Sequence, residues 1–433
     1  MTPVQIGILG CIVMLLLLMS SMPVAFVMAT VGLIGFGLLV NPHAALSMIT
    51  ADLYETTSSY SLTVIPLFVF MGQIAFHSGI SRRLFDAAYR WLGVLPGGMA
   101  MATVGACTAF GAICGSGPAT AATMASVALP EMRRFRYDME LACGSVASGG
   151  SLGMLIPPSV VFIVYGIMTE QSVGKLFIAG ILPGLLIAVL FCLTIWFNCR
   201  RRPELGPAAP PSTWMERFRS LGGVAETLVL FGLVMGGMFF GYCTPTEAAA
   251  VGAGGSLLIA AARRQLTWHS LFRSLQETAR TSCMVLIIVA GAKMFGHFLA
   301  VTRIPFALAE WLSGLPLPGW MIMAFIIGFY LLSGCFVDAL ALILLTIPIF
   351  YPVVIGLGYD PIWFGVIIVV VTQMGVISPP VGVNAYVVSG IERDVPLQTI
   401  FRGCMPFLVA LIIASVILVV FPQVSLFLPS LVR

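Results

Sequence analysis

Charged residues are scarce in this chain. Only 9% of its 433 residues are Asp, Glu, Lys or Arg, whereas 59% are hydrophobic, and the mean hydropathy is +1.06. A soluble protein of this length needs many more polar residues to cover its surface. The composition therefore excludes a soluble globular protein and gives no reason to expect a nucleic-acid partner. It predicts an all-α polytopic protein embedded in the lipid bilayer.

Catalytic and metal-binding motifs are also missing. The chain has four histidines and no HExxH motif, and its ten cysteines are scattered without a CxxC pair. Cysteines of this kind act as small apolar residues in helix packing. An intramembrane enzyme would need catalytic side chains on facing helices, so we expect no enzyme. The first basic residue is Arg82, and without a cationic start a cleaved signal peptide is not expected.

Apolar runs define the expected spans. Runs long enough to cross a bilayer lie near residues 4–22, 23–40, 61–78, 174–198, 224–241, 247–262, 281–300 and 404–429. Between them lie apolar stretches punctuated by Gly and Pro, at about 97–130, 139–168, 319–350 and 358–390. Turn signals at 114–118 and 333–335 predict that 97–130 and 319–350 are re-entrant helical hairpins. We expect their tips, 114–118 and 332–336, to meet near the middle of the membrane.

Matched motifs indicate an inverted repeat. The proline-broken segment 153–158 recurs at 375–380, and Met22-Pro23 is echoed by Thr244-Pro245. The predicted halves are 1–198 and 224–433, joined by a cytoplasmic linker at 199–223. Each half has one hairpin and one broken transmembrane helix, at about 139–168 and 358–390. Such paired interrupted helices are the sequence signature of a secondary transporter and of its binding site.

Arginine placement supports this topology. With both termini outside, on the periplasmic side, the inside segments are 79–96, 131–138, 199–223, 263–280 and 391–403. They hold 17 of the 21 basic residues, as the positive-inside rule requires. The outside loop 41–60 has no basic residue. Segments 79–96 and 263–280 suit helices lying in the interface, either as arms holding a mobile core or as plain anchors.

The two proline breaks are the expected binding sites for ions and substrate. Two consecutive prolines remove amide donors and free carbonyl groups, so each break facing a hairpin tip offers an oxygen cage suited to Na⁺. In the second copy the expected cage includes Gly375 and Ser378. The half-helices after the breaks, from Ser159 and Val381, favour an anionic group.

Polar side chains near the breaks are candidate substrate ligands. Thr120, Ser159 and Asn384 would donate or accept hydrogen bonds near the middle of the membrane. Asp338 either caps the returning hairpin arm or contacts cation or substrate directly. Lys293 lies in an apolar run, where an ionisable group is functional by default. It contacts a substrate carboxylate or a helix end, or else it snorkels or pairs with Asp338.

The chain resembles the large membrane subunit of the tripartite ATP-independent periplasmic (TRAP) transporters. The resemblance is carried by stretches 114–121, 153–159, 244–249 and 378–384, spread over nearly the whole chain. It implies a Na⁺-driven, elevator-type transporter for organic acids such as C4-dicarboxylates and sialic acids, in the bacterial inner membrane. It also implies a small four-helix membrane subunit and a periplasmic substrate-binding protein as partners.

The resemblance also assigns cation sites. The first Na⁺ site is expected at Ser116, Gly153, Ile156 and Pro158. The second is expected at Gly334, Gly375, Ser378 and Val381. Ser378 stands where the family often has Thr, and it keeps the hydroxyl group.

One alternative function remains at the level of sequence. A stand-alone Na⁺- or H⁺-coupled carboxylate symporter of the same superfamily would share the fold but need neither partner. A channel would not require a hairpin-bearing inverted repeat.

Overall fold

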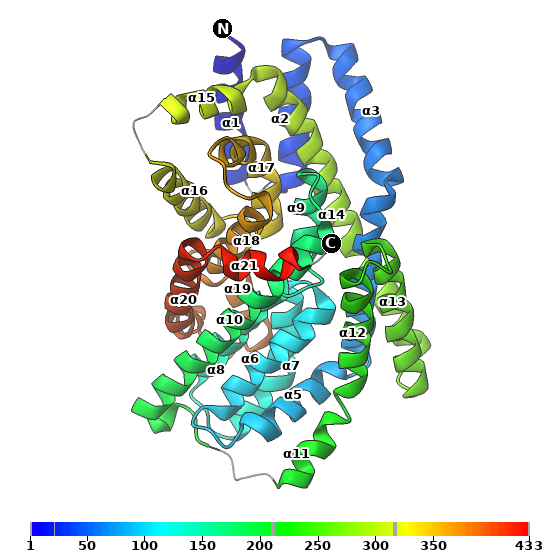
Figure 1. Cartoon of the computed structure of the whole chain (residues 1–433), viewed down its shortest axis with the longest axis vertical. Coiled ribbons are helices and arrows are strands. Elements are labelled where there is room, and N and C mark those ends of the chain that lie inside the picture. The colour runs from blue at the N-terminus through cyan, green and yellow to red at the C-terminus, as the bar shows by residue number, and fades with distance from the viewer. Residues whose placement is uncertain (1, 21, 209–212, 315–317, 432–433) are drawn as a thin grey trace.

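The computed structural model describes residues 2–20, 22–208, 213–314 and 318–431. Every regular element in these ranges is a helix, which confirms the all-α prediction. Figure 1 shows the helices in chain order from blue to red.

The first half of the sequence alternates long apolar helices with short breaks. Its helices are α1 (Pro3–Met19), α2 (Val24–Leu39), α3 (Pro42–Ser58), η1 (Tyr60–Thr63), α4 (Val64–His77), α5 (Ile80–Leu92), α6 (Gly98–Cys114), α7 (Gly117–Arg134), α8 (Met139–Ser151), η2 (Leu152–Met154), α9 (Val160–Met168) and α10 (Val173–Arg201).

The second half follows a related order. Its helices are α12 (Ala225–Phe239), α13 (Pro245–Ala262), α14 (Trp268–Thr302), α15 (Ile304–Gly314), α16 (Gly319–Gly334), α17 (Ala339–Gly356), α18 (Pro361–Ile377), α19 (Val383–Ile391), α20 (Leu397–Val420) and α21 (Gln423–Ser430). The linker before it contains η3 (Pro203–Leu205) and α11 (Trp214–Leu221).

Three expectations for the helices were wrong. Residues 41–60 are not a loop, because α3 fills most of the segment and Asn41 caps it by accepting a hydrogen bond from the Ala44 amide at 2.6 Å. Segment 263–280 is not a separate interfacial helix, since α14 runs without a break from Trp268 to Thr302. The run 404–429 is divided at Phe421 and Pro422, and α20 instead begins at Leu397.

Five of the described helices are long and apolar enough to cross a membrane, or six with the bent pair α11 and α12. The five spans are Tyr60–His77, Val173–Arg201, Trp268–Thr302, Ala339–Gly356 and Leu397–Val420. Helices α1, α2, α6, α16 and α18 are equally apolar but have 10–17 residues in the apolar stretch. The chain is therefore a multi-pass membrane protein, and several of its apolar helices are short for a full crossing.

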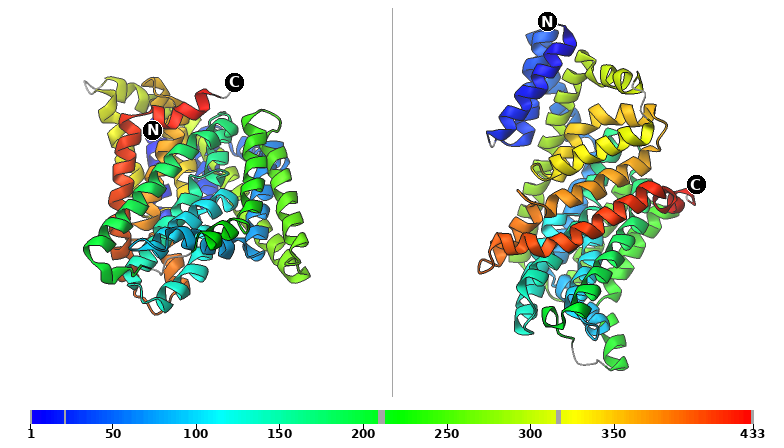
Figure 2. Two further views of the ribbon diagram at one scale, coloured as in Figure 1. Left: turned by 60° about the horizontal axis from the view of Figure 1, so that its bottom comes forward. Right: turned by 90° about the vertical axis from the view of Figure 1, so that its left-hand side faces the viewer.

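Helices from the two halves pack against each other in exchanged pairs. α2 packs on α14 while α4 packs on α13, and α8 packs on α20 while α10 packs on α18. At the centre, α7 packs on α19 and α9 packs on α17. Figure 2 shows α20, in red-orange, against the cyan and green helices of the first half. The buried core is therefore shared between the two halves.

Small residues allow the closest of these contacts. A Cβ atom at Gly144 of α8 would overlap the carbonyl group of Gly403 on α20. A Cβ atom at Gly32 of α2 would lie 2.7 Å from the backbone of Met294 on α14. Close backbone approach through small residues is the usual way in which membrane helices associate.

The helices form two groups that position the site. The hairpin group consists of the two helical hairpins (α6–α7 and α16–α17), the two broken helices (α8–α9 and α18–α19), and α10 and α20. The flanking group consists of α2, α4, α13 and α14, which pack on one another. The two groups meet where α4 packs on α6 and where α14 packs on α17.

Candidate functional site

The first break is closed by the tip of the first hairpin. α8 ends at Ser151, and the chain passes through η2 before α9 starts at Val160. A Cβ atom at Gly153 would lie 2.6 Å from the Thr120 hydroxyl oxygen and 2.8 Å from the Ser116 carbonyl oxygen. Only glycine therefore lets the break lie this close to the hairpin tip.

Hydrogen bonds fix this arrangement. The Val160 amide donates to the Gly115 carbonyl at 3.3 Å, so α9 begins on the hairpin tip. Ser159 caps α9, because its hydroxyl oxygen accepts from the Phe162 amide at 3.5 Å and also donates to the Met154 carbonyl. Thr120 donates its hydroxyl to the Ser116 carbonyl at 2.8 Å. Thr120 and Ser159 thus both stabilise the first break.

The second break repeats the contact with different residues. A Cβ atom at Gly375 would overlap the backbone of Gly334, so α18 touches the end of α16. The Val381 amide donates to the Cys335 carbonyl at 3.2 Å, in the manner of Val160 and Gly115. Ser378 donates its hydroxyl to the Met374 carbonyl at 2.6 Å.

The atoms at both breaks fit a hard cation. Around the first break the groups brought together are carbonyl and hydroxyl oxygens of Ser116, Thr120 and Pro158, since Gly115 lies directly against the Pro158 carbonyl. Na⁺ prefers such oxygen ligands, as other hard cations do. No group of three His, Cys, Asp or Glu side chains that could hold a metal occurs in the described part of the chain. Any cation here would therefore be held by neutral oxygens.

The predicted cation residues lie together within each copy. Gly153 contacts Ser116, and Pro158 contacts the neighbouring Gly115, while Ile156 is buried in the same loop and packs on Gly184. In the second copy Gly334 contacts Gly375, and Ser378 follows directly on α18. Val381 takes part through its amide, and its side chain is exposed.

A cavity of ≈ 290 Å³ lies between the hairpin group and the flanking group. Its lining residues come from the first hairpin tip, the start of α9, the start of α17, and the facing sides of α4 and α14. They are Val69, Gln73, Cys114, Gly115, Ser116, Gly117, Pro118, Ala119, Met154, Val160, Val161, Thr281, Met284, Val285, Asp338, Ala339 and Leu340.

Three helix N-termini converge on this cavity. α7 starts at Gly117, α9 at Val160 and α17 at Ala339, and all three residues line it. The first-turn amides of a helix have no acceptor within the helix and carry partial positive charge. The cavity therefore favours an anion on the side of α7, whereas the Val160, Phe162 and Leu340 amides of α9 and α17 already bond Gly115, Ser159 and Asp338.

Asp338 caps the start of α17, which was one of the two roles that the sequence predicted for it. Its carboxylate accepts a hydrogen bond from the Leu340 amide at 3.1 Å. It also lines the cavity, where it is the one carboxylate in the lining. Both interpretations of Asp338 are therefore compatible with its position.

Lys293 does not pair with Asp338, so that alternative was wrong. Its ammonium group lies 2.8 Å from Glu55 on α3, and it does not line the cavity. Nearby, His297 lies 3.2 Å from the Asp52 carboxylate, also on α3. The segment expected to be a loop thus supplies the partners of Lys293 and His297.

The other predicted substrate residues also lie outside the cavity lining. Asn384 is fully buried and donates to the Ala147 carbonyl at 3.0 Å, which ties α19 to α8. Thr120 and Ser159 face the first break. Of the five predicted substrate residues, the structure brings only Asp338 to the cavity.

Two polar residues of the flanking group were not singled out from the sequence. Gln73 on α4 and Thr281 on α14 face the hairpin tip across the cavity. An isolated polar residue in an apolar run was the available signal.

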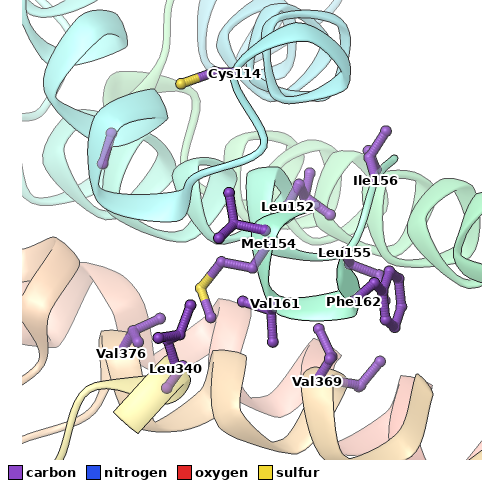
Figure 3. Close-up of a cluster of buried hydrophobic side chains, with 14 of the residues drawn as sticks. Cys114, Leu152, Met154, Leu155, Ile156, Val161, Phe162, Leu340, Val369 and Val376 are labelled. Carbon is purple, nitrogen blue, oxygen red and sulfur yellow. The ribbon is translucent and has the colours of Figure 1, made fainter. Parts of the chain in front are cut away.

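Side chains of both halves meet beside the cavity. Figure 3 shows Met154 of the first break in one buried cluster with Leu340 of the second hairpin and Val376 of α18. Met154 and Leu340 also line the cavity. The cavity therefore has walls from both hairpins.

An apolar helical bundle with two hairpins, two broken helices and a cavity beside them is the architecture of a membrane transporter. The family model of the tripartite ATP-independent periplasmic transporter, DctM component, matches residues 11–424. The chain therefore belongs to this family, which confirms the resemblance found in the sequence.

Named relatives agree with this assignment. The C4-dicarboxylate TRAP transporter large permease protein DctM of Pseudomonas aeruginosa is 38% identical over 394 residues, which cover 91% of each chain. The sialic acid TRAP transporter large permease protein SiaM of Vibrio cholerae is 32% identical over 416 residues, which cover 96% of each chain.

Among solved structures, the Alcanivorax borkumensis YdaH transporter is similar in fold. The TM-score is 0.64 at 13% sequence identity, and the match covers 90% of this chain and 88% of that one. At this identity the likeness concerns the fold alone.

Proposed function

We propose that this chain carries out Na⁺-coupled secondary active uptake of a small organic acid across the bacterial inner membrane. The observation that carries the proposal is the cavity on which the N-termini of α7, α9 and α17 converge. A carboxylate bound there would interact with the positive ends of three helix dipoles, and the N-terminus of α7, which has no side-chain cap, would offer its first-turn amides. The names of the C4-dicarboxylate and sialic acid relatives support an organic acid as the substrate class.

The remainder of the substrate would meet different groups. Gln73 and Thr281 offer neutral donors and acceptors, and Asp338 offers a carboxylate that accepts from a hydroxyl or ammonium group. A second carboxylate placed near Asp338 would be repelled. The lining therefore favours an acid with a hydroxyl or amino group at its far end, or an acid whose second carboxylate turns to Gln73.

The tip of the first hairpin, which both ligands would contact, supports Na⁺ coupling. Ser116 lines the cavity and its carbonyl oxygen lies at Gly153 of the first break. A cation held by that carbonyl would order the tip from which α7 starts. Ion and substrate would then stabilise the same tip conformation, which is the requirement for positive coupling between two ligands.

The two halves, 1–198 and 224–433 around the linker 199–223, would form an inverted repeat. The exchanged packing supports this proposal: α2 on α14 corresponds to α13 on α4, and α9 on α17 corresponds to α19 on α7. In an elevator mechanism the hairpin group would move against the flanking group. The interface between them would open and close the cavity.

The proposed transporter works with two partners and with both termini on the periplasmic side. A small four-helix membrane subunit would pack beside the flanking group, and a periplasmic binding protein would deliver the acid. The stand-alone symporter remains the alternative, because the cavity does not depend on either partner.

Uptake into proteoliposomes tests the proposal. Vesicles with this chain and a candidate four-helix partner are supplied with radiolabelled organic acids and a candidate binding protein. We expect accumulation only with an inward Na⁺ gradient and only with the binding protein. Full uptake without Na⁺ under a proton gradient contradicts the coupling, and saturable uptake by the chain alone establishes the stand-alone symporter.

A further inference from the structure

Two further hollows lie beside α10 and α20, and they share no lining residue with the cavity. The first is an apolar groove of ≈ 550 Å³, lined by residues that include Leu190, Leu193, Phe197, Val409 and Ile413. Leu193, Phe197 and Val409 are each about half exposed in the described chain. In a multi-pass membrane protein, an apolar groove on the outer side of two spanning helices is filled by lipid tails.

The second hollow is polar and continues the first. It has a volume of ≈ 490 Å³ and is lined by Asp138, Glu140, Arg201 and Arg202 among others. Asn198 and Pro406 line both hollows. An apolar groove therefore opens directly into a charged pocket.

The charges in this pocket are not paired with each other. No ion pair within 4.0 Å joins these two arginines to either acid in the described part of the chain. The Arg201 guanidinium instead stacks over the Phe197 ring, 4.0 Å from its centroid, at the point where the groove meets the pocket. One oxygen of Asp138 caps α8 by accepting from the Glu140 and Leu141 amides. Its second oxygen is available to a ligand.

The charges of this pocket are complementary to a zwitterionic lipid head group. Guanidinium groups bind phosphate through several parallel hydrogen bonds. A pocket that bound only an anion would not also place two carboxylates in its wall. A phosphate followed within a few bonds by an ammonium group satisfies both pairs of charges. The apolar groove at the same place accommodates an acyl chain.

We propose that α10 and α20 form a site for an aminophospholipid of the phosphatidylethanolamine class. Its acyl chain lies in the groove along Leu193 and Val409. Its phosphate binds Arg201 and Arg202, and its ammonium group binds Glu140 and Asp138. The site does not depend on the transported substrate, because no residue of it lines the cavity between the two helix groups.

Native mass spectrometry of the delipidated full chain in detergent tests this site. Phosphatidylethanolamine, phosphatidylcholine and phosphatidylglycerol with identical acyl chains are added at equal concentrations. We expect phosphatidylethanolamine to bind best, because trimethylation removes the ammonium donors and glycerol removes the positive charge. Equal binding of all three lipids, or preference for phosphatidylglycerol, overturns the proposal.

Matched variants locate the lipid. Arg202→Gln should weaken binding of phosphatidylethanolamine roughly tenfold, as expected for loss of a charge-assisted contact, and Glu140→Gln should remove its advantage over phosphatidylcholine. Arg219→Gln on α11 is the control, because Arg219 lines neither the groove nor the pocket. Leu193→Trp should narrow the groove and reduce binding of all three lipids. Unchanged binding in Arg202→Gln, with a Tm equal to that of the control, contradicts the site.

Discussion

The two proline-broken helices carry the same motif in different surroundings. Residues 151–160 around the first break are buried throughout, and Ser159 caps the half-helix that follows. At the second break Pro379, Pro380 and Val381 are exposed, and α19 starts from Gly382 in a left-handed conformation without a side-chain cap. Phe336 at the second hairpin tip is 63% exposed. The first break is thus a packed support, whereas the second is open on one side.

Unpaired polar groups also gather on the side of the second break. Gln373 on α18 is fully buried, and neither its amide nitrogen nor its carbonyl oxygen has a partner among the described residues. The side-chain oxygen of Asn384 on α19 is likewise without a donor. Buried polar groups of this kind cost about 1–3 kcal/mol each when nothing binds them. The second break is therefore the more exposed of the two, and it lies beside buried polar groups that lack a partner among the described residues.

The largest effect is expected at the glycine contacts of the two breaks. Gly375→Ala should lower the free energy of unfolding by about 3 kcal/mol and abolish uptake, because its Cβ atom meets only the Gly334 backbone. Gly153→Ala should cost about 2 kcal/mol, because part of its overlap is with the Thr120 hydroxyl, which can move. Thermal unfolding in detergent measures both.

The control for the glycine pair is Gly236→Ala, since nothing lies within 4 Å of a Cβ atom there. A Gly375→Ala variant as stable and active as this control would contradict the tight contact between Gly375 and Gly334, and with it the difference between the two breaks.

The next effect concerns the cation at the second break. Ser378→Ala should raise the Na⁺ concentration for half-maximal uptake roughly tenfold, equal to about 1.4 kcal/mol, because one oxygen ligand is lost. Combination with Gly153→Val should weaken the Na⁺ dependence further. Ser415→Ala is the matched control, since Ser415 is also a buried serine whose hydroxyl bonds a backbone carbonyl, at 2.9 Å to Ile412. An unaltered Na⁺ curve for Ser378→Ala excludes its hydroxyl as a ligand.

A smaller effect is expected on the flanking wall of the cavity. Gln73→Leu should raise the KM for the acid about fivefold, close to 1 kcal/mol, with little change in the Na⁺ curve, because it removes one hydrogen bond to substrate. Gln398→Leu, on α20 and outside the cavity lining, serves as the control. If Gln73→Leu shifts the Na⁺ curve and leaves KM unchanged, the residue belongs to the ion sites instead.

The smallest effect concerns the hydrogen bonds and ion pairs that hold the C-terminal ends of α9 and α19. Tyr165 of α9 donates its hydroxyl to the Pro361 carbonyl at 2.6 Å, whereas the segment after α19 is joined to Arg133 of α7 by ion pairs with Glu392 and Asp394. Tyr165→Phe should lower stability by about 1 kcal/mol at any salt concentration. Tyr54→Phe, an exposed tyrosine, is its control. A stability loss in Tyr165→Phe that disappears at high salt would contradict a neutral hydrogen bond.

Local signals predicted the parts of the fold that local chemistry determines. The turn at residues 114–118 and the Pro-Pro pairs are visible in the sequence because Gly and Pro restrict the backbone where they stand. α3 was missed because its mixture of apolar, hydroxyl and charged residues resembles an outside loop. Its helix is stabilised by packing on α2 and α14, which no local pattern records.

The substrate site was the least predictable part. Asp338 was found because its position before a helix arm is a local feature. Gln73 and Thr281 reach the cavity only through the packing of the flanking group against the hairpin group. Lys293 was interpreted from its apolar neighbours alone, and its partner Glu55 belongs to the helix that the sequence did not reveal.

The contact between Gly144 and Gly403 has a consequence for biosynthesis. α8 is made early, yet the helix that covers its glycine face, α20, is nearly the last to leave the ribosome. Until then the glycine face of α8 that α20 covers is exposed to lipid. Insertion into the bilayer and completion of the tertiary structure are therefore separated in time, and we expect a chain truncated before α20 to be recognised by membrane quality control.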